Sequence, residues 1–182
     1  MDAETRFTEL YRRHHAAVWT YALRRLPAGT DPADATAEVF AVAWRRLDGV
    51  PSEPETVLWL YATARRVVAN HARAAGRRHR LAGRLAGLRD SREPATDPQP
   101  PEHADVLAAL DRLKPADREA IRLAVWEDLP VQDIARVLGC SANAASLRLG
   151  RARRRLGAEL AHPTGGAAVR HAVLPTAERG TE

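Results

Sequence analysis

Arginine is the residue type with the clearest chemical potential in this chain, and it is concentrated in two separate stretches. Residues 61–92 carry nine arginines against one aspartate, and residues 139–160 carry five arginines against one glutamate. The stretches before and between them are acidic, although the whole chain has a net charge of +5. Guanidinium groups bind phosphate oxygens and the edge of guanine through paired hydrogen bonds. Two basic blocks separated by acidic ones therefore predict a polyanion that is held at two places.

The second basic block lies in a pattern that is typical of a helix-turn-helix. Apolar residues at helical spacing predict a short helix over residues 131–138, and Gly139 ends it because glycine adopts a positive φ at little steric cost. Ser141 is a good N-cap for a second helix, since its hydroxyl can accept a free backbone N–H of the first turn. Opposite the apolar stripe of that helix lies a face that fits the major groove, formed by Asn143, Leu147, Arg151 and Arg154.

The residue types on this face indicate how it would read a duplex. Asn143 can pair with the edge of adenine, and Leu147 can contact a thymine methyl unless another helix covers it. Arg148 and Arg151 can reach guanine or phosphate, whereas the run 153–155 is expected to contact phosphates. A helical hairpin with a cationic helix need not bind DNA, so for this stretch alone a solvated surface helix is the alternative.

Composition and motifs restrict the class of function. The chain of 182 residues has room for one domain or two small ones, and 45% apolar residues permit a packed core. A single cysteine, Cys140, excludes an internal disulfide, and without clustered Cys or His ligands we expect no metal and no cofactor. The sequence has neither a phosphate-binding glycine loop nor a nucleophile motif, so we expect no enzymatic activity. The lack of a membrane-length apolar run and of a secretion signal predicts a cytoplasmic protein.

Helical periodicity runs through almost the whole chain and predicts an all-α fold. Apolar residues at 3–4 spacing predict a helix over residues 7–26 and another over residues 32–47. A third helix is expected to begin near Glu55 and to continue through an alanine- and arginine-rich stretch to Leu88. We find no stretch with the alternation that would indicate a strand.

A change in composition divides the chain into two small helical domains. Four prolines in residues 91–101, SREPATDPQPP, disfavour helix and predict a flexible Pro-rich linker. Helix is predicted to resume at Asp105, and the segment after Ala161 has so little periodicity that we expect it to be disordered. The predicted order is a first domain, a linker, a second domain that contains the helix-turn-helix, and a tail, over residues 1–88, 89–104, 105–160 and 161–182.

The order of these segments resembles a bacterial sigma factor of the extracytoplasmic-function (ECF) type, in the sigma-70 superfamily. The resemblance covers about residues 7–160, and four stretches carry it: FTELYRRHHAAVWTYALRRL, DPADATAEVFAVAWRRLD, WLYATARRVVANHARAAGRR and LDRLKPADREAIRLAVWEDLPVQDIARVLGCSANAASLRLGRARRRL. It implies that the first domain corresponds to sigma region 2 and the second to sigma region 4. A protein of this kind is a promoter-specificity subunit of RNA polymerase.

The resemblance implies that the second of the four stretches, DPADATAEVFAVAWRRLD, binds the clamp helices of the largest polymerase subunit. Acidic residues early in a helix complement its positive end, and an exposed aromatic beside charges suits a protein interface. Ala37 stands where the family usually carries glutamine, so this contact is expected to differ from the common one. Core packing is an equally good expectation for the two aromatic residues. The implied contact residues are Asp34, Glu38, Phe40, Trp44 and Arg45.

The third stretch resembles the helix with which the family melts promoter DNA and reads the −10 element. Cationic contacts to a single strand and stacking platforms offset the cost of unpairing bases. Trp59 and Tyr61 could stack bases, although core packing is the better expectation for Trp59. Helical spacing points Arg65 and Arg73 outward and puts Arg66 on the flank. The implied −10 residues are Arg65, Arg66, Asn70, Arg73, Arg77 and Arg78, with Asn70 where the family often has aspartate.

The resemblance assigns reading of the −35 element to the second domain, through Asn143, Ser146, Leu147, Arg148, Arg151 and Arg154. The implied partners are core RNA polymerase, through its clamp helices and flap, promoter DNA, and an anti-sigma factor. The alternative is a stand-alone helix-turn-helix regulator with a helical dimerisation or sensor domain. That alternative accounts for the second basic block but gives the first no reason to be basic.

Overall fold

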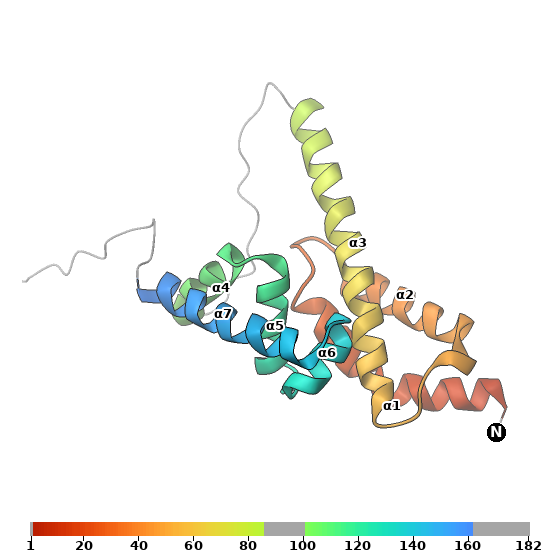
Figure 1. Ribbon diagram of the computed structural model, residues 1–182. Helices are drawn as coiled ribbons and strands as arrows, with labels where there is room; N and C mark the ends of the chain where they lie inside the picture. The colour runs from red at the N-terminus through yellow and green to blue at the C-terminus, as the bar shows by residue number, and fades with distance from the viewer. Residues whose placement is uncertain (1, 86–100, 162–182) are drawn as a thin grey trace, which may run out of the picture.

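The computed structural model describes residues 2–85 and 101–161. Within these ranges the chain forms seven α-helices and one short 3-10 helix, and they contain no strand, which confirms the predicted all-α class (Figure 1). The described helices also include none that is both long enough and apolar enough to cross a membrane. Most of the predicted linker and the predicted tail lie outside the described residues.

The first group of helices forms around α1 (Ala3–Leu23), α2 (Pro32–Arg45), the 3-10 helix η1 (Leu47–Gly49) and α3 (Glu55–Leu85). Local sequence sets the starts of the first two helices. Asp2 accepts a hydrogen bond from the backbone N–H of Thr5 at 2.7 Å, and Asp31 accepts one from Ala33 at 2.8 Å. Each cap satisfies a backbone donor that has no partner inside the helix. The apolar faces of α1, α2 and α3 meet in a core that contains Val18, Val39, Leu60, Ala64 and Val67.

The second group consists of α4 (Pro101–Arg112), α5 (Pro115–Val125), α6 (Val131–Leu138) and α7 (Ala142–Ala161). Gly139 ends α6 with a φ of 67°, as expected from the sequence, and the Ser141 hydroxyl accepts the N–H of Ala144 at 3.2 Å. Helix α4 begins at Pro101, four residues before the predicted position. A proline is well tolerated in the first turn because its missing N–H would have no helical partner there.

The two groups of helices lie against each other, and one helix extends beyond both. Helix α3 packs on α6 as well as on α1 and α2. Figure 1 shows the later part of α3 projecting away from the rest of the described structure, and residues 77–82 of this part are exposed. Helix α7 lies on the other helices of the second group and runs in a different direction from α3. The two arginine-rich stretches are therefore presented on separate parts of the molecule.

Candidate DNA and polymerase interfaces

Helix α7 separates a buried apolar stripe from an exposed polar face. Ala145, Leu149 and Ala152 are buried against α5 and α6. The predicted base-reading residues Asn143, Ser146, Leu147, Arg151 and Arg154 are all exposed. Leu147 is 61% exposed, so no helix within the described residues covers it. An apolar side chain in this position is suited to contact a thymine methyl in the major groove.

Two arginines of α7 are directed towards a buried carboxylate. The side chain of Asp117, in the first turn of α5, is only 9% exposed. Arg155 donates to it at 2.7 Å, and Arg148 lies 4.0 Å from it. The sequence patterns above did not single out Asp117, although an acidic residue two positions after Pro115 is a helix-start signal that could have drawn attention to it. The carboxylate therefore joins α5 to α7 through Arg155 and lies close to Arg148, which is half-buried.

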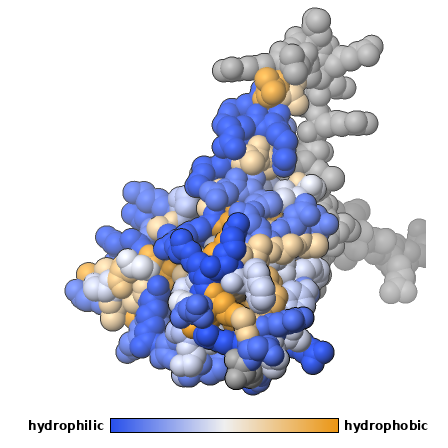
Figure 2. All heavy atoms as spheres, turned by 90° about the vertical axis from the view of Figure 1, so that its right-hand side faces the viewer, coloured by the Kyte–Doolittle hydropathy of each residue, from blue (hydrophilic) through white to orange (hydrophobic). Residues whose placement is uncertain are grey.

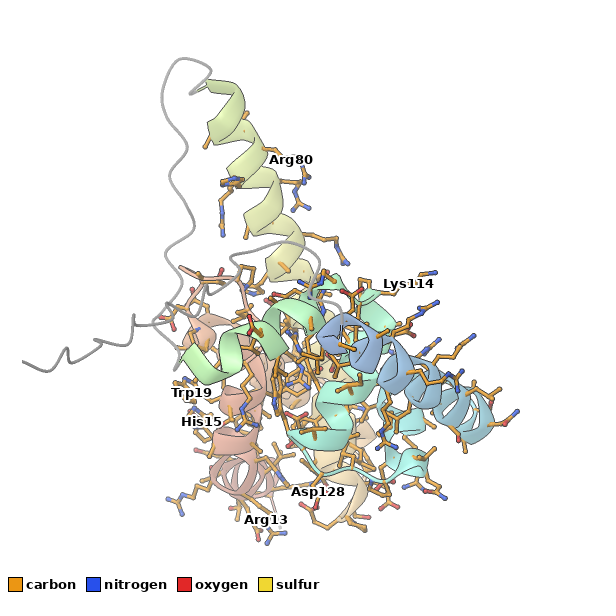
Figure 3. All side chains as sticks on the ribbon, turned by 90° about the vertical axis from the view of Figure 1, so that its left-hand side faces the viewer. Arg13, His15, Trp19, Arg80, Lys114 and Asp128 are labelled. Carbon is orange, nitrogen blue, oxygen red and sulfur yellow. The ribbon has the colours of Figure 1, made fainter. Side chains whose placement is uncertain are left out.

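Helix α3 presents most of its predicted DNA-binding residues to solvent. Arg66, Asn70, Arg73, Arg77 and Arg78 are exposed, or partly so, and Arg73 donates a hydrogen bond to the Asn70 side chain at 2.5 Å. Figure 3 labels Arg80 on the projecting part of the same helix, so the cationic surface continues past the predicted set. A cationic surface of this kind is suited to follow a nucleic-acid backbone.

One orientation on α3 differs from the prediction. Arg65, expected to point outward, is half-buried, whereas Arg66, expected on the flank, is exposed. The reason is that α3 contacts α1, α2 and α6, so its buried face is wider than the single apolar stripe that was read from the sequence.

The aromatic residues near the start of α3 serve the fold. Tyr61 is buried, and its ring stacks on that of Tyr21 with 5.2 Å between the centroids. Burial raises the pKa of the Tyr61 hydroxyl, with a further contribution from the carboxylate of Glu127. Trp59 is half-buried and packs against the core. In this arrangement Tyr61 has no ring face free to stack a base, and the expected core role of Trp59 is confirmed.

Helix α2 presents a charged and aromatic surface on one side. Asp34, Glu38, Trp44 and Arg45 are exposed, and Trp44 is 48% exposed. A shallow hollow beside Trp44 is lined by Arg45 and Trp59 among others, and Figure 2 shows hydrophobic and hydrophilic surface interleaved on the side that carries the end of α2. Exposed aromatic surface bordered by charges is typical of protein interfaces.

Phe40 corrects one expectation for this surface. Its side chain is only 3% exposed, so its ring lies in the core and not among the contact residues. It packs 4.7 Å from the ring of Tyr11, while Trp44 packs edge-on against Phe7 at 5.0 Å. Phe40 faces inward because it lies on the side of α2 that meets α1, where its ring packs on that of Tyr11.

A histidine connects the α2 surface to α3. The His71 ring nitrogen lies 2.9 Å from a carboxylate oxygen of Glu38. The apolar pattern of α3 puts His71 on the inward face, and it is half-buried there. Its pairing with Glu38, a predicted polymerase-contact residue, could not be read from either helix alone. No group of three or more His, Cys, Asp or Glu residues in the described ranges is arranged to hold a metal ion.

Family models match both parts of the chain. Residues 10–78 match the model for sigma-70 region 2, and residues 103–156 match the model for sigma-70, region 4. The first match covers most of α1, all of α2 and most of α3, and the second covers the helix-turn-helix.

Named relatives agree with these matches. The RNA polymerase sigma factor NccH of Alcaligenes xylosoxydans xylosoxydans is 30% identical over 164 residues, which cover 85% of this chain and 86% of NccH. The ECF RNA polymerase sigma factor SigE of Mycolicibacterium smegmatis is 31% identical over 158 residues, 81% of this chain and 59% of SigE. The ECF sigma factor BldN of Streptomyces coelicolor is 29% identical over 139 residues, 73% of this chain and about half of BldN (52%).

Solved structures show the same fold. CnrH, in complex with the cytosolic domain of CnrY, is similar with a TM-score of 0.61 and 28% identity over 85% of this chain and 87% of that chain. The sigma factor RpoE from Bartonella quintana, in complex with the anti-sigma factor NepR, has a TM-score of 0.64 over 85% of this chain and 96% of that chain, at 23% identity. With two region models in the expected order and relatives matched along most of the chain, this protein belongs to the sigma-70 family of RNA polymerase sigma factors, in its ECF group.

Proposed function

We propose that this protein directs RNA polymerase to promoters by holding two DNA elements with two separate arginine-bearing helices. Helix α7 reads the −35 element as duplex, and helix α3 opens and reads the −10 element. The observation that supports this most directly is the exposure of both cationic faces, on two different helices of one chain. The protein itself makes and breaks no bond, because the polymerase carries out the chemistry.

Roles within the two DNA surfaces follow from residue chemistry. On α7, Asn143 and Arg151 contact base edges, Leu147 contacts a thymine methyl, and Arg154 contacts the backbone. Ser146 and Arg148 lie beside them as further contacts. On α3, the residues that follow the separated strand near the −10 element are Arg65, Arg66, Asn70, Arg73, Arg77 and Arg78.

We assign polymerase binding to the α2 surface, with Trp44 as its aromatic centre and Asp34, Glu38 and Arg45 around it. The flap of the polymerase is the proposed partner of the second domain. An anti-sigma factor is a further proposed partner, because the sigma factor RpoE from Bartonella quintana, which has a similar fold, was solved in complex with the anti-sigma factor NepR. A subunit of this machine acts in the cytoplasm, where bacterial polymerase and DNA lie.

Transcription in vitro tests this proposal. Purified protein is mixed with core polymerase and a library of promoters that are randomised at the −35 and −10 positions, and the transcribed templates are sequenced. We expect one enriched pair of elements, and we expect the protein to co-purify with core polymerase. Silence of every template despite binding to core polymerase would overturn the proposal. A tight gel shift with duplex DNA and no affinity for polymerase would instead identify a stand-alone regulator.

A further inference from the structure

The His71 ring joins two of the proposed binding surfaces. Its Nε2 atom lies 2.9 Å from the Oε2 atom of Glu38, across the contact between α3 and α2. Glu38 belongs to the proposed polymerase surface on α2, whereas His71 directly follows Asn70 of the proposed −10 set on α3. Figure 1 shows α2 beside the packed part of α3, before α3 projects from the molecule. The pair therefore lies where these two helices meet.

The direction of this hydrogen bond follows from the chemistry of the two groups. An ionised carboxylate only accepts, so the Nε2 atom of His71 carries the hydrogen and donates it to Oε2 of Glu38. Among the residues that the structure describes, none donates to the second oxygen, Oε1. Glu38 therefore keeps one carboxylate oxygen for a donor from another molecule.

The two side chains differ in exposure and in freedom. The imidazole is 24% exposed, whereas the Glu38 side chain is 45% exposed. Histidine has two side-chain torsions, and the packing of α3 on α2 restricts them further. Glutamate has three torsions and samples several rotamers when it is surrounded by water. The ring is thus a fixed donor that restrains a flexible carboxylate.

A neighbouring charge adds to the need for this restraint. Asp34 lies one helical turn before Glu38 on the same face of α2, and both residues are exposed. Like charges at this spacing repel each other, but repulsion alone leaves the direction of the Glu38 carboxylate unspecified. The hydrogen bond from His71 specifies it. The two carboxylates together make this part of α2 attractive to a basic side chain.

We propose that His71 is a positioning residue for polymerase binding, which holds Oε2 of Glu38 so that Oε1 is presented to a basic side chain of core polymerase. This inference rests on the proposed function of the α2 surface. A side chain that is already restrained loses less conformational entropy when it binds, and the difference corresponds to about two- to tenfold in affinity. In this role His71 itself contacts neither polymerase nor DNA.

Side-chain couplings in the free protein test the first step. Three-bond couplings, measured by nuclear magnetic resonance, report whether the χ1 and χ2 angles of Glu38 occupy one rotamer or several. We expect one dominant rotamer in the parent and averaged couplings in His71→Ala. Glu4, an exposed glutamate of α1, should be averaged in both proteins. Averaged couplings of Glu38 in the parent, or no change in His71→Ala, would overturn the inference.

A double-variant cycle with core polymerase tests the second step. His71→Ala should bind polymerase about two- to tenfold more weakly than the parent. Glu38→Ala should bind more weakly still, because the basic group of the partner loses its charged acceptor. In the Glu38→Ala background, His71→Ala should change the affinity by less than about twofold, since His71 acts only through Glu38. An equal loss in both backgrounds would contradict the inference.

Two further variants separate positioning from a general loss of structure. His71→Gln keeps an N–H donor and should bind polymerase to within about twofold of the parent. His79→Ala is the matched control, because His79 is an exposed histidine of the same helix, and it should bind like the parent. Circular dichroism should show the same helix content in all variants. A loss in His71→Gln as large as that in His71→Ala would show that the ring acts through packing and not as a donor.

Promoter opening distinguishes positioning from direct contact with DNA. At a concentration that saturates polymerase, His71→Ala should open the −10 region at the parent rate. Slower opening at saturation would assign His71 to the DNA surface and overturn the inference. If the parent itself does not bind core polymerase, the proposed function fails, whereas the couplings in the free protein still decide whether His71 restrains Glu38.

Discussion

The two arginine-bearing helices are held in different ways. Helix α7 packs on α4, α5 and α6, and the buried carboxylate of Asp117 pairs with Arg155 and lies 4.0 Å from Arg148. Helix α3 is packed only in its first part, and its later arginines project into solvent. A rigid helix with preset side chains suits the fixed geometry of a duplex groove, whereas a projecting cationic helix suits a strand whose shape changes. This difference in support favours duplex reading by α7 and strand capture by α3.

The largest expected effect is a difference in stability between substitutions on the buried and on the exposed side of α7. Leu149→Ala removes a buried side chain and should lower the free energy of unfolding of the second domain by about 2–5 kcal/mol. Leu147→Ala, two residues away and exposed, should change it by less than about 0.5 kcal/mol. Urea unfolding followed by circular dichroism measures both. Equal decreases would show that Leu147 is covered in solution and that the assigned reading face is wrong.

A smaller effect is expected from the reading face itself. Arg151→Ala should weaken binding to a −35 duplex by about 1–3 kcal/mol and relax the preference at one base pair. Fluorescence anisotropy with polymerase-bound protein and a labelled −35 duplex measures this change in affinity. Melting of the −10 region should be unaffected on a template in which the −35 element is already mismatched.

Substitution of an exposed arginine on α3 should affect the −10 region and not the −35 element. Arg66→Ala should leave −35 binding unchanged and slow promoter opening, because the variant no longer binds a phosphate of the separated strand. The slope of single-strand affinity against salt concentration, both on logarithmic scales, should fall by about 0.7 for each phosphate that the variant leaves unneutralised. Permanganate footprinting of the −10 region follows opening. A decrease in −35 affinity in this variant would contradict the assignment of the −35 element to α7 and of the −10 element to α3.

The smallest effect is expected from a change at Asp117, the α5 residue whose carboxylate pairs with Arg155 of α7. Asp117→Asn should cost about 1 kcal/mol of stability, since Arg155 is half-exposed and its ion pair is screened by water. The released arginine should add to phosphate binding and raise affinity for unrelated duplex slightly. Competition with non-specific DNA detects the change, and a fall in non-specific affinity would contradict the role given to Asp117.

Local sequence determined the helices, the turn at Gly139, the caps at Asp31 and Ser141, and the outward set on α7. These features depend on neighbours within a few residues, so propensity, capping and periodicity suffice to predict them. The family resemblance rested on the same local patterns in a fixed order, and it was confirmed.

Only the tertiary structure decided which aromatic of α2 is exposed, that Arg65 is half-buried, and that Arg25 pairs with Glu119 and Glu127. Phe40 and Trp44 are one helical turn apart and both are large aromatics, and only the position of α1 distinguishes them. Arg25 is separated by 94 and 102 positions from its two partners, so no local pattern indicates that they meet. Burial of a charge depends on which surfaces come together, and that is a property of packing between domains and not of any single segment.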